Sequence, residues 1–165
     1  MKKTLLFLSI VTIFSISLKA QEYKTAVGIR LGPGSPAISG GFTIKHFLDE
    51  KHAVEGIVGI NGGIGVCALY EWHLPIATVE HLQWYAGAGG YAAYRNNTVF
   101  VMGEESSTSY KSNTSYVGAA GIVGVDYKFQ DIPLNISIDW KPELNFIESV
   151  GFEASGVGFS ARFTF

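Results

Sequence analysis

The feature that most constrains this sequence is a two-residue alternation of apolar and polar side chains, repeated in most of the chain after residue 20. In the segment LNISIDW, residues 134–140, every even-numbered residue is apolar and every odd-numbered residue is polar. Alternate residues of a β-strand point to opposite faces, so this period predicts strands with one apolar face and one polar face. No convincing 3.6-residue apolar period occurs after residue 20, and the chain is therefore expected to be all-β.

Eight segments show this alternation, and the links between them differ in length. The predicted strands are 24–32, 38–47, 53–62, 64–74, 82–94, 116–129, 134–140 and 156–165. The links at 48–52, 75–81 and 130–133 are short, whereas those at 95–113 and 143–154 are long. Short turns at one end and longer loops at the other are typical of an even-stranded, up-and-down barrel.

The polar face of the predicted strands carries ionisable residues among many glycines. They are Arg30, Lys45, Glu55, Glu71, Asp126, Asp139, Lys141 and Arg162. An eight-stranded barrel has an interior just wide enough to be filled by side chains, which suits glycine next to long charged residues but not a full set of large apolar ones. A soluble, lipocalin-like barrel would need the reverse arrangement. The pattern predicts an eight-stranded antiparallel transmembrane β-barrel with its apolar face toward lipid and its charges inside.

The N-terminus has the layout of a secretory signal peptide. Lys2 and Lys3 precede a charge-free run of 14 residues, 5–18, which is too short to span a membrane. We expect cleavage after Ala20, giving a signal peptide at 1–20 and a single barrel domain at 21–165. Without the three lysines of the signal, nine basic residues face 14 acidic ones, which argues against nucleic acid as a partner. Cys67 is the only cysteine, so no internal disulfide is possible.

Aromatic residues cluster near the predicted strand ends, as in the girdles of membrane barrels. Toward the turns these are Tyr23, Trp72, Trp84, Tyr127, Phe129, Phe163 and Phe165, and toward the loops Tyr94 and Trp140. Together with the signal peptide, the DWKP motif at 139–142 and the terminal FSARFTF, the sequence resembles the small outer-membrane β-barrel domain family of Gram-negative bacteria. The resemblance implies insertion into the outer membrane by the barrel-assembly machinery, with Phe163 and Phe165 as the C-terminal assembly signal, and implies no reaction.

Neither an enzyme nor a cofactor is expected from the residues. The four histidines, His46, His52, His73 and His81, fall at or near the turn end, away from Ser106, Ser107 and Ser109 in the long link. A serine activated by histidine is therefore not expected. His46, His52 and His73 could approach one another, but their spacing matches no metal-ligand motif.

Two interpretations of function remain open at this stage. The interior charges could form a plug of ion pairs in a structural or surface-interaction protein, or they could line a narrow channel or transporter for small solutes. The link at 95–113 could protrude as a hairpin or fold back over the barrel mouth. If it protrudes, its partner-binding residues would be Val99, Phe100, Val101, Met102, Glu104 and Glu105.

Overall fold

The computed structural model describes residues 23–32, 38, 40–60, 63–102, 107–147, 150–154 and 156–165, and at 97–102 and 107–112 the backbone alone. The predicted signal peptide therefore lies outside the described residues. These residues form ten strands: β1 Thr25–Leu31, β2 Gly40–Phe47, β3 His52–Gly59, β4 Gly63–Pro75, β5 Leu82–Met102, β6 Ser107–Lys128, β7 Leu134–Trp140, β8 Glu143–Asn145, β9 Gly151–Glu153 and β10 Val157–Thr164. Among the described residues, no helix is long and apolar enough to cross a membrane.

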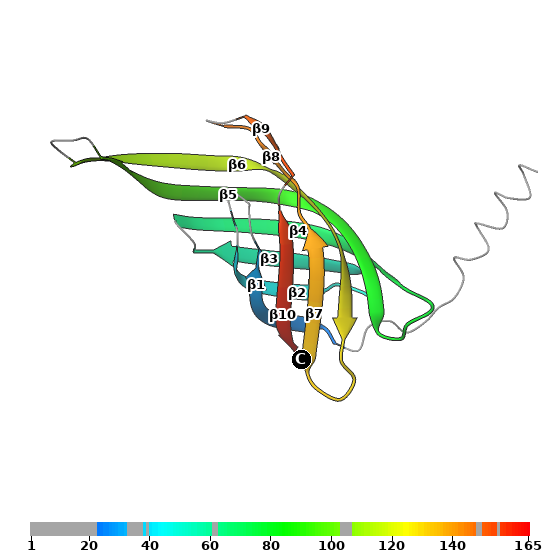
Figure 1. Ribbon diagram of the computed structural model, residues 1–165. Coiled ribbons are helices and arrows are strands. Elements are labelled where there is room, and N and C mark those ends of the chain that lie inside the picture. The colour runs from blue at the N-terminus through cyan, green and yellow to red at the C-terminus, as the bar shows by residue number, and fades with distance from the viewer. Residues whose placement is uncertain are drawn as a thin grey trace, which may run out of the picture.

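Eight of these strands form a closed antiparallel barrel, which confirms the predicted fold (Figure 1). Their order is β5-β4-β3-β2-β1-β10-β7-β6, and β6 pairs back onto β5. The β2–β3, β4–β5 and β6–β7 links lie at one end, which we call the turn end; the opposite end is the loop end. β1 and β10 are adjacent, and Thr25 and Phe165 exchange backbone hydrogen bonds of 3.0 and 2.9 Å.

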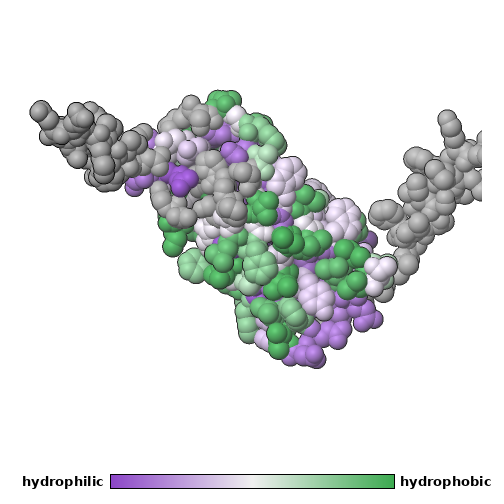
Figure 2. All heavy atoms as spheres, viewed as in Figure 1, coloured by the Kyte–Doolittle hydropathy of each residue, from purple (hydrophilic) through white to green (hydrophobic). Residues whose placement is uncertain are grey.

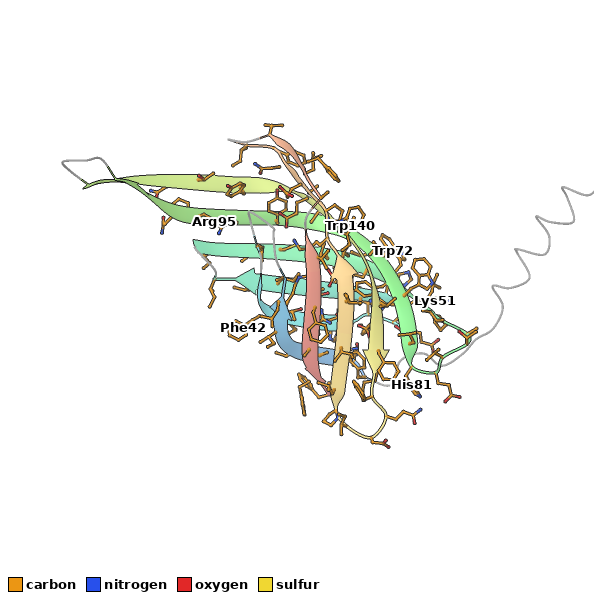
Figure 3. The ribbon with its side chains drawn as sticks, in the orientation of Figure 1. Phe42, Lys51, Trp72, His81, Arg95 and Trp140 are labelled. Atoms are coloured by element: carbon orange, nitrogen blue, oxygen red, sulfur yellow. The ribbon has the colours of Figure 1, made fainter. Side chains whose placement is uncertain are left out.

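The alternation of side chains places the apolar face outside, as predicted. On β1, Val27 and Ile29 are 41% and 48% exposed, whereas Arg30 beside them is 2% exposed. Figure 2 shows hydrophobic residues covering the middle of the visible face. A contiguous apolar surface of this kind far exceeds what a soluble monomer exposes, so it is the surface of a barrel that spans a membrane. Trp72, three residues before the turn end of β4, and Trp140, at the loop end of β7, both lie on this outer surface (Figure 3).

Two apolar residues predicted to lie outside are instead buried. Tyr23, placed in the girdle by its sequence position, is 8% exposed and packs edge-on against Phe47 at a ring distance of 5.3 Å. Ile38, assigned to the outer face of its strand, is 3% exposed and belongs to an interior apolar cluster. Both residues lie outside the bounds of β1 and β2. There the strand pleat no longer dictates the direction of a side chain, so the prediction from alternation fails.

The predicted long link at 95–113 is mostly strand rather than loop. β5 and β6 stay in register from Arg95↔Thr114 to Met102↔Ser107, and Figure 1 shows the pair extending well beyond the other strands. β4 pairs with β5 only as far as Gly63↔Arg95. The seven residue pairs beyond that point, 96–102 with 107–113, form a two-stranded extension about 20 Å long, which we call the ribbon.

The predicted link at 143–154 also contains strands. β8 continues along β6 where β7 ends, with Leu144 opposite Ala119, and β9 pairs with β8 as a short hairpin. The indole nitrogen of Trp140 donates to the carbonyl of Ala154 at 2.5 Å and so ties this hairpin to the end of β7.

The turn end is closed by local hydrogen bonds. In the β2–β3 turn, one carboxylate oxygen of Asp49 accepts from the backbone N–H groups of Lys51 and His52 at 2.8 and 2.9 Å. Hydrogen bonds to the carboxylate favour its charged form, so they lower the pKa of Asp49, and the bond from the Lys51 backbone contributes most. In the β4–β5 turn, His81 adopts a φ of 62° and accepts a backbone bond from Lys128 at 3.1 Å. Lys51 and His81 lie at the same end in Figure 3.

The lipid-facing interpretation predicts a large difference between two exposed isoleucines. Ile138 lies within β7 and is 53% exposed, while Ile132 lies in the β6–β7 turn and is 48% exposed. Ile138→Arg should lower the free energy of unfolding by about 2–4 kcal/mol, because it places a charge on the lipid face, and Ile132→Arg should change it little. Reversible urea unfolding in lipid vesicles measures both. Equal effects of the two substitutions would contradict an apolar belt in lipid.

Candidate functional site

The candidate site is the charged interior of the barrel, which brings together residues from eight strands, β1–β4, β6–β8 and β10. The structure places all eight predicted interior charges there, each 4% exposed or less, together with Glu143, which the sequence interpretation did not include. The ion pairs form three groups: Arg30 with Asp139, Lys141 with Glu143, and a larger cluster around Lys45 and Arg162.

Arg162 of β10 reaches across the interior to Glu55 of β3. Its Nη2 lies 2.5 Å from Oε1 of Glu55, and its Nη1 donates to Ser137 at 2.8 Å and to Asn135 at 3.3 Å. Thr43 accepts from Nε of Arg162 at 3.3 Å and donates to the same Glu55 oxygen. Each of the three guanidinium nitrogens therefore donates to at least one acceptor, and such compensation is what allows a charge to remain buried.

Lys45 of β2 lies among three carboxyl groups. Its Nζ is 2.8 Å from Glu71, 3.3 Å from Glu55 and 3.7 Å from Asp126. The same ammonium group lies 4.1 Å from the centre of the Tyr85 ring, a cation–π contact. One lysine thus joins β2, β3, β4 and β6 at a single point.

In the other two ion pairs, Arg30 and Lys141 each contact a single carboxylate. Arg30 and Asp139 form a bidentate ion pair. Nη1 of Arg30 donates to Oδ2 of Asp139, and Nη2 donates to Oδ1 at 2.6 Å. Gly158 makes room for it, because a Cβ there would overlap the Arg30 guanidinium group. Lys141 pairs with Glu143 two residues further along the chain.

Below the charges, aromatic rings close the turn end of the interior. The imidazole of His73 stacks flat on Tyr85, with centroids 4.9 Å apart and an interplanar angle of 11°, and Phe47 packs edge-on against it at 4.7 Å. His73 is 1% exposed, so its expected place at an interface or turn is wrong. Its position opposite the apolar residues of LYEWHL was the signal that it points inward.

Toward the loop end, the interior is filled by apolar side chains. The cluster consists of Ile38, Ile57, Cys67, Leu69, Tyr85, Tyr91, Ala93, Ala120 and Ile122. Ile57, which interrupts the alternation of its strand, is 1% exposed in this cluster. Apolar packing on one side of the charges and aromatic packing on the other leave a filled interior, as expected for eight strands.

The remaining predicted residues lie away from the interior. Phe163 and Phe165 are exposed on the outer face at the turn end, 56% and 66% respectively. Val99, Phe100, Val101 and Met102 lie in the β5 part of the ribbon, where the backbone alone is described, and Glu104 and Glu105 fall outside the described residues. Among the described residues, no group of three or more His, Cys, Asp or Glu side chains is placed to hold a metal ion.

Comparison with known proteins agrees with the fold. No family model matches the sequence, and no curated protein matches it. The crystal structure of the N-terminal β-barrel domain of Pseudomonas aeruginosa OprF is similar to this chain with a TM-score of 0.54. The similarity covers 86% of this chain and 94% of that one at 15% sequence identity. At this identity, the likeness is one of architecture.

The buried pair of Arg30 and Asp139 should be strongly coupled. Asp139→Asn alone should lower the free energy of unfolding by about 3–5 kcal/mol, because it leaves an uncompensated guanidinium group in the interior. Arg30→Met combined with Asp139→Leu should cost less than the sum of the two single changes. A double-mutant cycle by urea unfolding measures the coupling, and additive effects would contradict a buried, solvent-excluded pair.

Proposed function

We propose that this chain is a non-enzymatic outer-membrane β-barrel protein with a closed lumen and a structural or surface-interaction role. The observation that carries the proposal is the filled interior: charges compensated by ion pairs, with apolar side chains toward the loop end and aromatic rings toward the turn end. The expected signal peptide, the lipid-facing belt and the architecture shared with the OprF barrel domain support the outer membrane as its location.

In this proposal the interaction surface is the ribbon. Beyond Gly63 of β4 and Asn145 of β8, its two strands pair only with each other among the described residues. Each therefore has one edge with free backbone donors and acceptors, which an added strand can use. Val99–Met102 is the apolar part of this edge. The ribbon thus offers an unidentified surface partner a site that the barrel wall lacks.

The exposed C-terminal aromatics suggest a second, transient partner. Phe163 and Phe165 lie on the outer face of the last strand, with ring centroids 6.3 Å apart. In the proposed function they present the strand to the barrel-assembly machinery during insertion and afterwards contact membrane lipid.

A closed lumen should carry no current. The refolded protein in a planar lipid bilayer should show no conductance steps across a range of voltages, while a wide-pore porin in the same lipid serves as the positive control. Reproducible steps at low protein concentration would contradict the plug and favour the alternative, a narrow channel for small solutes.

The ribbon should be dispensable for the barrel itself. Joining Asn96 to Asn113 by a two-residue turn removes 97–112 but keeps every pairing of β4 with β5 and of β6 with β7. The shortened protein should keep its heat-modifiable band on gels run with and without boiling, and its unfolding midpoint in urea should stay the same. A failure to fold would show that the ribbon serves stability rather than interaction.

A further inference from the structure

The cluster around Lys45 is unbalanced in charge. Glu55, Glu71 and Asp126 all contact its ammonium group, and the second cation of the cluster, Arg162, binds Glu55. Three carboxyl groups thus share two cations, whereas Arg30 and Lys141 each pair with a single carboxylate. Side chains of Lys45, Glu55, Glu71 and Arg162 are fully buried and that of Asp126 is 4% exposed. A lone extra negative charge at such depth is costly, and carboxyl groups usually avoid it by keeping a proton.

The contacts of Glu71 show where a proton fits. Its Oε2 lies 2.8 Å from Nζ of Lys45 in an ion pair and makes a hydrogen bond of 2.9 Å with Nε2 of His73. Oε1 of Glu71, Oε2 of Glu55 and Oδ2 of Asp126 are buried and have no hydrogen-bond partner among the described residues. Glu55 and Glu71 share the Lys45 ammonium group, with oxygens 3.3 and 2.8 Å from its Nζ, so their carboxyl groups are neighbours. Two carboxyl groups can hydrogen-bond only if one of them carries a proton.

Glu71 is the better holder of that proton than Glu55. Glu55 is bound as an anion, since its Oε1 accepts from both Arg162 and Thr43. Glu71 contacts no arginine among the described residues, and Asp126, the third carboxyl group, accepts from the side-chain amide of Asn135. A proton on Oε1 of Glu71 leaves Oε2 as an acceptor and supplies a donor that the buried carboxyl oxygens of this cluster lack.

His73 is poorly placed to carry the charge instead. Its Nε2 and the Lys45 ammonium group contact the same Glu71 oxygen, so an imidazolium would lie against a second cation. The side-chain amide of Gln83, whose oxygen and nitrogen exchange places by a half-turn, lies 3.2 Å from Nδ1. A neutral ring that donates from Nε2 and accepts at Nδ1 fits both neighbours.

We propose that the barrel interior contains a proton-binding site in which Glu71 is a neutral carboxylic acid, hydrogen-bonded between Glu55 and His73. The site does not depend on the proposed surface role. Its other neighbours are Lys45 of β2, Tyr85 and Gln83 of β5, Asp126 of β6 and Arg162 of β10. Loss of the proton would leave an uncompensated carboxylate beside Glu55, so the interior is held together by a proton as well as by ion pairs.

The site couples folding to pH in a defined direction. In an unfolded chain, glutamate ionises at about pH 4.3 and histidine becomes neutral at about pH 6.5, so above pH 6.5 neither holds a proton there. The folded protein keeps one on Glu71. Folding therefore takes up one proton, and stability falls as pH rises above about 6.5. Between about pH 4.3 and 6.5, His73 holds one proton in the unfolded chain, and Glu71 holds one in the folded protein. The two states then bind equally many protons at these residues, so the free energy of unfolding does not change with pH on their account.

The experiment measures reversible urea unfolding of the refolded protein in lipid vesicles between pH 7 and pH 9. For the unmodified protein, the unfolding equilibrium constant should rise about tenfold per pH unit. Glu71→Gln keeps the shape, the donor to Glu55 and the acceptor for Lys45, so it should fold and remove this dependence. Glu143→Gln, which alters the buried carboxylate that pairs with Lys141, and Glu50→Gln, in the exposed β2–β3 turn, should leave the pH dependence intact.

Infrared spectroscopy of the unmodified protein tests the same site without relying on a variant. The folded protein at pH 8 should show the carbonyl stretch of a protonated carboxyl group, separate from the carboxylate bands, and Glu71→Gln should lack it. The proposal is overturned by absence of this band, by an unfolding constant independent of pH, or by an unchanged pH dependence in Glu71→Gln. A stability that follows sodium concentration instead of pH would assign the site to a metal cation and would also overturn it.

Discussion

The contact between Arg162 and Glu55 is the interaction on which the rest of the barrel depends. The two residues belong to β10 and β3, which are not neighbours in the sheet, so their bond crosses the interior. Thr43, Asn135 and Ser137 complete the coordination from two further strands. Backbone pairing joins each strand only to the next, whereas this polar centre ties opposite walls together. It therefore provides the tertiary contacts that a hydrophobic core provides in a soluble protein.

This arrangement follows from the medium on the outer side. The apolar side chains of the outer face are already in contact with lipid, so the hydrophobic effect does not drive them into the interior. The interior must then be specified by hydrogen bonds and ion pairs, whose geometry is more exacting than apolar packing. Glycines such as Gly158 make the long charged side chains fit, because a Cβ there would occupy the space of the Arg30 guanidinium group.

Much of this could be predicted from the sequence because alternation reports which face a residue occupies. It placed Arg30, Lys45 and Arg162 inside without any knowledge of their partners. Alternation says nothing about depth along the barrel or about partners, so the stack of His73 on Tyr85 could not be predicted. It also fails where a strand ends, as at Tyr23 and Ile38. For the link at 95–113 the sequence left open a protruding hairpin or a segment folded over the barrel mouth, because the pairing of the ribbon is determined by continuity with β5 rather than by an apolar face.

The ribbon and the closed interior are connected through stability. A two-stranded hairpin is marginal in water by itself, since each strand has a partner on one side only. Here the two strands leave the barrel already paired over Leu82–Arg95 and Thr114–Tyr127, so their register is set before they pass the rim. A rigid wall at the base lowers the entropy that the ribbon would lose on accepting a further strand. A barrel braced across its interior is therefore well suited to holding a protruding edge, which the proposed surface-interaction role requires.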